Sequence, residues 1–244
     1  MSTLSDIADG ARALGRLFFP HLCPVCRDVI EGKEQHICTQ CLVDAPFTGY
    51  EHMAENPVAT RIWNIVPIER ACSTLFYVHE GRWRNLAYNF KFRGQWRDAL
   101  AAGRMMGNIL AQSPLWGHID SVAAIPLHPT RKLLREYNQS DFLAQGIAQQ
   151  LNIPHIQGAI RRTVNNRPQR QTPTKEQRWD NVEGIFSVAK PTLLQGRHLL
   201  LVDDVFTTGA TIISCCEAIL RAAPDCHISV ATLFASKQEV GIKD

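Results

Sequence analysis

The middle and the end of the chain alternate short apolar runs with longer stretches in which apolar residues recur at every third or fourth position. Short apolar runs are typical of buried strands, whereas the longer spacing is typical of helices. The pattern predicts strands at 71–78, 121–125, 198–202 and 228–234. It predicts helices at 83–92, 96–112, 131–151 and 211–223. This alternation indicates an α/β fold, with a mostly parallel sheet and helices on both faces.

The segments outside this alternation have a different composition. Residues 4–18 predict a short amphipathic helix, which we expect to dock onto the protein rather than to anchor it in a membrane. Residues 20–49 are rich in cysteine, proline and glycine, and the polar residues 50–60 predict a linker. The arginine-rich residues 157–181 predict a mobile loop. We therefore expect two domains, with the bounds 1–55 and 61–244.

The composition is that of a folded protein with one or two domains. Of the 244 residues 45% are hydrophobic and 20% are charged, which excludes a disordered tail, a collagen and a coiled coil. Apolar runs stay far short of the roughly 20 residues that span a bilayer, and we see no secretory signal. We therefore expect a cytoplasmic protein without membrane insertion.

Charge is distributed unevenly along the chain. The formal net charge is +3, yet residues 61–180 carry 17 basic and 8 acidic side chains, which is a net charge of +9. The segments on either side carry a net negative charge. A basic middle segment predicts a surface that faces an anion, although a solvated face with excess arginine would give the same count.

Half of the eight cysteines lie in two C-x-x-C pairs near the start of the chain, which are Cys23, Cys26, Cys38 and Cys41. Four thiolates at this spacing can close a tetrahedral zinc site, and a closed site is structural rather than catalytic. A segment of roughly 30 residues has too little core to fold alone, and metal ligation supplies the missing stability. The spacing predicts structural Zn²⁺. A redox pair and a metal-free knuckle are the alternatives, and His21 or His36 could replace one ligand.

The most specific pattern lies at the predicted strand that begins at 198. This apolar run ends at Asp203 and Asp204, and a hydroxyl-rich loop with Gly209 then opens a helix. Ligands of open α/β sheets bind beyond the carboxyl ends of the strands, and the amides of a helix N-terminus favour a phosphate. Acids at that place can accept hydrogen bonds from ribose hydroxyls. An ordinary helix cap would leave two acids at the end of a buried strand unexplained.

These residues carry a resemblance to known proteins. Residues 202–211 resemble the phosphoribosyl pyrophosphate (PRPP) motif of the type I phosphoribosyltransferases. The four-cysteine knuckle resembles the ComF/GntX family of competence-related proteins, as do residues 77–94, 125–139 and 161–186. The resemblance covers nearly the whole chain. It implies a type I phosphoribosyltransferase-like domain preceded by a small zinc knuckle.

The resemblance also implies residue roles. Asp203 and Asp204 would be the catalytic pair, which holds the ribose hydroxyls, or Mg²⁺ through water. The 5′-phosphate would be wrapped by Thr207, Thr208, Gly209, Ala210 and Thr211. On the pyrophosphate side the resemblance implies Arg131 and Lys132. Lys91 is a further candidate there, although cations at a helix C-terminus are also ordinary caps.

Three functions follow as hypotheses. The first is a phosphoribosyltransferase of unknown acceptor that binds PRPP with Mg²⁺ and acts in DNA uptake, competence or the use of imported DNA. The second is a non-catalytic adaptor that keeps the PRPP pocket as a nucleotide sensor and binds single-stranded DNA or DNA-processing proteins. The third is a mainly structural adaptor. The arginine-rich residues 161–178 would either neutralise the phosphates of a single strand or close over PRPP.

Overall fold

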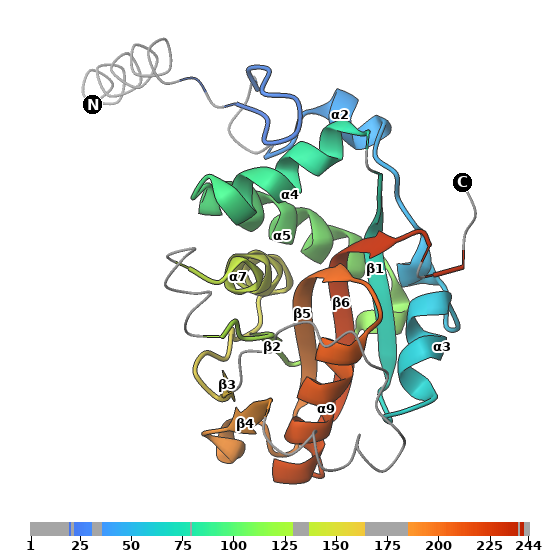
Figure 1. Cartoon of the computed structure of the whole chain (residues 1–244), viewed down its shortest axis with the longest axis vertical. Helices are drawn as coiled ribbons and strands as arrows, with labels where there is room; N and C mark the ends of the chain where they lie inside the picture. Colours follow the sequence, from blue (N-terminus) through green and yellow to red (C-terminus); the bar gives the residue numbers. More distant parts are fainter. Residues whose placement is uncertain are drawn as a thin grey trace, which may run out of the picture.

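A parallel sheet of four strands forms the centre of the computed structural model (Figure 1). The structure describes residues 20, 22–30, 36–78, 80–128, 137–163, 185–238 and 240–241. The strands in spatial order are β1 (Arg70–Tyr77), β6 (His227–Ser236), β5 (His198–Phe206) and β2 (Ser121–Ala124). Every neighbouring pair in this order is parallel, so all four carboxyl ends lie along one edge of the sheet. The predicted parallel α/β sheet is therefore confirmed.

Helices cover both faces of the sheet, as the alternation predicts. The chain passes from β1 to β2 through α4 (Arg82–Phe92) and α5 (Trp96–Ala111), and it passes in the opposite direction from β5 to β6 through α9 (Ala210–Ala222). Because parallel crossovers are right-handed, opposite directions of travel place these helices on opposite faces. The further helix α7 (Gln139–Leu151) packs on α5, and α3 (Pro57–Trp63) packs on β1 (Figure 1).

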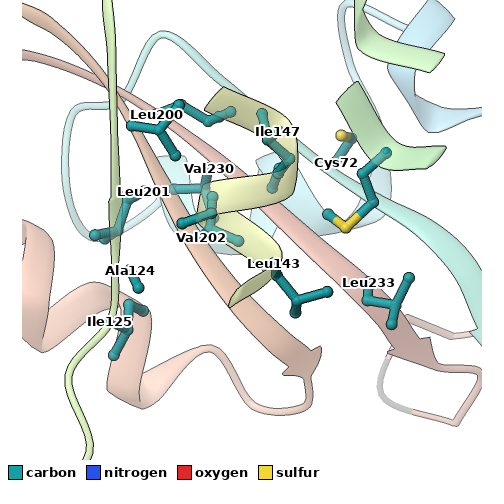
Figure 2. Close-up of a cluster of buried hydrophobic side chains, with 14 of the residues drawn as sticks. Cys72, Ala124, Ile125, Leu143, Ile147, Leu200, Leu201, Val202, Val230 and Leu233 are labelled. Carbon is teal, nitrogen blue, oxygen red and sulfur yellow. The ribbon is translucent and has the colours of Figure 1, made fainter. Parts of the chain in front are cut away.

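One part of the core lies between the sheet and α7. Figure 2 shows Leu143 and Ile147 of α7 beside Val202 and Val230 of the two central strands. All four side chains are fully buried. Fully apolar strands such as 199–202 are expected in a parallel sheet, since helices shield both faces from water.

Glycines allow α5 and α7 to pack at very short range. A Cβ atom at Gly103 would lie 2.2 Å from the carbonyl oxygen of Leu143, and one at Gly146 would lie 2.5 Å from that of Leu100. The two helix backbones are thus in contact, which fixes the position of α7 over the sheet.

Two strand-like features that the sequence did not predict add to the fold. Val122 of β2 accepts from the amide of Ile156 at 2.8 Å and donates to Pro154 at 3.0 Å, so the chain around His155 continues the parallel sheet beyond β2. The antiparallel pair β3 (Ile160–Arg162) and β4 (Phe186–Val188) packs its β4 strand on α9.

Three predictions of local structure are wrong in part. Residues 50–60 are not a linker: a 3-10 turn spans Tyr50–His52, and α3 begins at Pro57 because the side chain of Asn56 accepts from two amides of its first turn. The predicted loop at 157–181 is wrong at 160–162, where β3 pairs with β4. The helix predicted at 131–151 is not continuous in its described part: Tyr137 and Asn138 are not helical, and α7 begins at Gln139, where Asn138 has an extended backbone and caps Ser140.

Other predictions fall on residues outside the described ones. These are the helix at 4–18, the first part of the helix predicted at 131–151 and the greater part of the arginine-rich segment. Within the described part of the chain, no helix combines the length and the apolar character that crossing a membrane requires. The division into domains at 1–55 and 61–244 stays a prediction.

Candidate functional site

The two adjacent acids lie in the last part of β5, which runs to Phe206 and so extends beyond the predicted strand. Asp203 accepts a hydrogen bond at 2.9 Å from the hydroxyl of Ser140, in the first turn of α7. The same carboxylate oxygen accepts from the amide of Asp204, also at 2.9 Å. The start of α7 thus fixes the orientation of Asp203 at the carboxyl edge of the sheet.

Lys91 reaches this edge from the last turn of α4. Its Nζ atom lies 2.8 Å from Oδ2 of Asp204, and only 21% of the lysine side chain and 16% of the aspartate side chain are exposed. The structure therefore brings together one of the three predicted pyrophosphate-side cations and the predicted acid pair. Lys91 is more than a helix cap, because its charge is directed at an acid of a different element.

Burial changes the pKa of Asp203, one of the two adjacent acids. Burial and the charge of Asp204 raise the pKa of Asp203 to about 7, against the opposing effects of its hydrogen bonds and of Lys91. At neutral pH Asp203 is therefore divided between its charged and neutral forms. A cation or a hydroxyl donor that binds there would favour the charged form, so ligand binding at this place would release a proton.

The loop after β5 forms the start of α9. Thr207 and Thr208 are exposed, and Gly209 precedes the helix with a φ of +80°, a conformation that favours glycine. The hydroxyl of Thr208 accepts from the amide of Ala210 at 3.4 Å. The first amides of a helix have no acceptor within the helix and can bind an anion. Thr211 lies in this first turn, so all five predicted phosphate ligands lie on one loop and helix start.

The segment that follows β2 approaches the same edge. Ile125 donates its amide to Val202 at 2.9 Å, and the side chain of Asn138 donates to the carbonyl of Ile125 at 3.0 Å. The hydroxyl of Tyr137 donates to the carbonyl of Phe90, next to Lys91, at 2.5 Å. Arg131 and Lys132 lie between these two anchors but outside the described residues. Both described ends of this segment therefore adjoin the acid pair or Lys91.

Sequence reasoning missed Ser140, Asn138 and Tyr137 as parts of this edge. The cap of α7 at Asn138 has a local signal, because asparagine is a preferred residue at that position. The hydrogen bonds of Ser140 and Tyr137 have no local signal, since their partners lie 63 and 47 residues away.

The four predicted zinc ligands form a compact cluster at the other end of the described chain. All four Sγ atoms lie within 4.8 Å of one another, and those of Cys26 and Cys38 are 3.7 Å apart. In a tetrahedron with Zn–S distances of about 2.3 Å, neighbouring sulfurs are separated by about 3.8 Å. The cluster therefore has the size that a four-cysteine zinc site requires, and it is the one such group among the described residues.

Two local structures present these sulfurs. Leu22 and Val29 pair in an antiparallel bridge, and between them Arg27 adopts a φ of +70° that closes the first knuckle. Cys38 stands at the start of the short helix α2 (Thr39–Val43), and its carbonyl accepts from the amide of Leu42 at 3.1 Å. Both pairs are therefore held by backbone hydrogen bonding close to the sulfurs.

The protonation of the thiols also fits a cation site. Although burial raises the pKa of Cys23, hydrogen bonds with the backbone of Cys26, Cys38 and Val25 lower it overall to about 7. Burial raises the pKa of Cys26 to about 11 and raises that of Cys41 as well. Without a cation Cys23 ionises readily, whereas Cys26 and Cys41 resist ionisation. A bound dication would supply the charge that the remaining thiolates need.

The knuckle rests on α5 through charged contacts. Arg27 donates to Asp98 at 2.7 Å and also to Gln95. His36 accepts from Arg104 at 2.6 Å, so this histidine is engaged with α5 and does not join the four sulfurs. A cavity of about 370 Å³ lies between the two parts. It is lined by residues of both, among them Ile37, Leu42, Phe47, Ala101 and Met105.

Comparison with known proteins finds a family and several relatives. Residues 140–244 match the phosphoribosyl transferase domain family. Competence protein F of Haemophilus influenzae is 26% identical over 207 residues, which cover 80% of this chain and 89% of that protein. Competence protein ComFC of Bacillus subtilis is 26% identical over 216 residues, or 88% of this chain and 84% of that protein. DNA utilization protein YhgH of Escherichia coli O157:H7 is 34% identical over 102 residues, or 42% of this chain and 44% of that protein.

Proposed function

We propose that this chain, a homologue of competence protein F and ComFC with a phosphoribosyl transferase domain, binds PRPP with Mg²⁺ at the carboxyl edge of its sheet. The observation that carries the proposal is the meeting of Lys91, the acid pair and the start of α9 at that edge. A cation can bind the pyrophosphate, the acids can accept hydrogen bonds from ribose hydroxyls, and the amides of a helix start can bind a phosphate.

Each group has a proposed role. Asp203 and Asp204 hold the ribose hydroxyls, and Mg²⁺ bound near them would neutralise the charge of the pyrophosphate group. The 5′-phosphate lies in the loop Thr207–Thr211, where its charge meets the helix N-terminus. Lys91 exchanges Asp204 for a pyrophosphate oxygen, and Arg131 and Lys132 contribute further positive charge on that side.

Ribosyl transfer is the reaction that such a site supports. The bond between the anomeric carbon and pyrophosphate breaks, the pyrophosphate leaves with the bonding electrons, and an acceptor nucleophile forms a new bond to that carbon. Positive charge develops on the ribose as negative charge develops on the leaving group. Lys91 stabilises the leaving group from its place at this edge, and the basic residues 131–132 add positive charge for the leaving group. A site that binds PRPP without an acceptor would act as a sensor instead.

The biological setting proposed for the chain is the use of imported DNA in the cytoplasm. The names of two relatives refer to competence and the name of a third refers to DNA utilization. The net charge of +9 over residues 61–180 suits a polyanionic partner. In this setting residues 161–178 contact the phosphates of a single strand, and DNA-processing proteins are further partners.

The knuckle is proposed to hold one structural Zn²⁺. Cys23, Cys26, Cys38 and Cys41 would fill all four positions of a tetrahedral site, so a bound zinc would have no open position for catalysis.

Calorimetric titration with PRPP, with and without Mg²⁺, tests the proposed site. We expect binding by the wild type and its loss in Asp203→Asn/Asp204→Asn. The exposed acid Asp225 provides the matched control, since Asp225→Asn leaves binding unchanged. Equal affinity of the wild type and the double variant would remove the acids from the site. Release of pyrophosphate in the presence of candidate acceptors then separates a transferase from a sensor.

A further inference from the structure

Aromatic side chains that soluble proteins normally bury are exposed on the outer side of α4. Tyr88 is 48% exposed and Phe92 is 65% exposed, and their rings lie 5.2 Å apart. With Arg84 they follow the spacing of four residues that places side chains on one face of a helix. These three residues are called the α4 stripe below. Figure 1 shows α4 as the outermost helix of its layer, above α5.

The opposite face of α4 packs against the rest of the protein. Trp83, Leu86 and Phe90 are buried in the core, and Lys91 pairs with Asp204 at the sheet edge. The position of α4 is thus fixed by its inner contacts. Packing against the core therefore does not explain the α4 stripe.

Arginines accompany the exposed rings. The guanidinium of Arg93 lies 5.4 Å from the centre of the Tyr88 ring, and that of Arg97 lies 4.6 Å from the centre of the Trp96 ring. Trp96 itself stacks on Phe142 at 5.1 Å and is 36% exposed. Contact with a ring holds an arginine in a defined place while its donors remain available to an anion.

The charge of this region has one sign. Residues 82–97 contain five cations, which are Arg82, Arg84, Lys91, Arg93 and Arg97, and no acid. Lys91 is paired inward, and the four arginines are exposed. Exposed rings between exposed arginines match the two parts of single-stranded nucleic acid, because bases stack on rings and phosphates bind guanidinium groups.

We propose that the α4 stripe, with Arg93 and Arg97, is a binding surface for single-stranded DNA on which bases stack against Tyr88 and Phe92. The inference rests on the proposed role in the use of imported DNA and assigns part of that role to a described surface. A second copy of the chain is a poorer occupant, because an isologous contact would bring two like-charged sets of exposed arginines together.

The test uses a fluorescent single-stranded poly-dT oligonucleotide and the full-length, zinc-loaded protein. We expect the wild type to bind at low salt and Tyr88→Ala/Phe92→Ala to bind at least about tenfold more weakly. The matched control is Phe47→Ala, which removes a 40% exposed ring that lines the cavity between the knuckle and α5 and leaves binding unchanged. PRPP affinity, measured on the same samples, stays at its wild-type value in both variants.

A second measurement addresses the arginines. Loss of two phosphate contacts in Arg84→Gln/Arg93→Gln reduces the slope of log affinity against log salt by about 1.4, since each single-strand contact contributes about 0.7. Arg221→Gln, an exposed arginine on α9, leaves the slope unchanged. Photocrosslinking of a bromodeoxyuridine oligonucleotide to the wild type, which requires no variant to fold, is expected to label peptides that contain residues 84–93.

The outcomes separate this inference from the proposed function. Wild-type DNA affinity in the ring variant, or crosslinks confined to other segments, would overturn the α4 stripe and leave residues 161–178 as the DNA contact. If the wild type does not bind DNA at low salt, both the α4 stripe as a binding surface and the proposed DNA role are wrong. The PRPP titration still tests the proposed PRPP site independently. A dimer that the ring variant converts to a monomer, with DNA affinity unchanged, overturns the inference in favour of self-association.

Discussion

Lys91 and Asp204 lie 2.8 Å apart at the carboxyl edge of the sheet, although 113 residues separate them in the chain. Lys91 comes from the end of α4 and Asp204 comes from β5, so this contact joins the helical layer to one of the two central strands. It also sets the charge of the proposed PRPP site before any ligand binds. The charge of Asp204 is paired with that of Lys91. One carboxylate oxygen of Asp203 instead accepts two hydrogen bonds, from the hydroxyl of Ser140 and from the amide of Asp204.

Removing Lys91 is expected to destabilise the fold. Lys91→Met leaves Asp204 mostly buried without its cation, and we expect a loss of about 1–2 kcal/mol of unfolding free energy. A double-mutant cycle with Asp204→Asn, followed by urea denaturation, measures the coupling. The more exposed pair of Arg197 and Asp120, at 3.7 Å, is the control and should couple by less than about 0.5 kcal/mol. Equal coupling in both pairs would contradict the argument.

Asp203 is expected to lower the stability of the folded protein as pH rises. Its pKa is about 7 in the folded protein against 3.8 for an ordinary aspartate, so the charged form is disfavoured by folding. The resulting penalty is absent below about pH 4, grows as pH rises and is complete above about pH 7. We therefore expect Asp203→Asn to raise unfolding free energy by about 1–3 kcal/mol at about pH 8, with a gain that shrinks as pH falls.

Urea denaturation between about pH 5 and pH 8 measures this gain. The exposed acid Asp225 serves as the control, because Asp225→Asn removes a carboxylate that is already solvated. A gain that is constant over this range, or that increases toward low pH, would show that the pKa of Asp203 is not raised by folding.

The contact between α5 and α7 leaves no room for a methyl group at Gly103. A Cβ atom there would lie 2.2 Å from the carbonyl oxygen of Leu143, which is backbone and cannot rotate away. Gly103→Ala is therefore expected to cost about 3 kcal/mol or more, because α7 must shift from its place over β5. Gly117→Ala, whose Cβ would meet its nearest atom at 3.8 Å, should change stability by less than about 0.5 kcal/mol. Thermal unfolding of both variants checks the difference.

The main strands and helices could be predicted from the sequence because their patterns are local. The strand predicted at 71–78 is observed as Arg70–Tyr77, and the helix predicted at 96–112 is observed as Trp96–Ala111. The linker predicted at 50–60 is an exception, because this segment contains α3. Asn56 and Pro57 resemble loop residues, yet asparagine before proline at the first helical position is also a signal for a helix start.

The site could be predicted only in part. Asp203 and the loop that follows it are found because strand, acids, hydroxyls and helix are consecutive in the chain. Ser140 could not be predicted as a partner of Asp203, since this contact depends on how α7 packs over the sheet. The spacing of the cysteines predicts the cluster of four sulfurs, but it carries no signal for the contact of Arg27 with α5.

The cysteine cluster is expected to bind one zinc ion per chain. Elemental analysis of protein purified without chelator measures it, and Cys38→Ser should lose the metal. Hydrogen exchange should then increase in residues 22–48, while the strands of the sheet stay protected. Cys226→Ser changes a buried cysteine outside the cluster and should retain the zinc. Wild-type protein without zinc would leave the metal-free knuckle as the correct interpretation.

Arg27 is expected to fasten the knuckle to α5 without taking part in metal binding. Burial raises the pKa of Asp98 above its usual value and Arg27 opposes this shift, so loss of the guanidinium would disfavour the charged acid still further. Arg27→Met leaves the buried carboxylate without that cation, and we expect a loss of about 1–3 kcal/mol of unfolding free energy with the zinc content unchanged. Arg27→Met/Asp98→Asn, which removes both charges, should recover part of this loss. The stability of the single variant should also improve as pH falls, because protonation of Asp98 removes the unpaired charge. Loss of zinc in Arg27→Met, or a pH profile like that of the wild type, would show that Arg27 acts on the knuckle itself and not through Asp98.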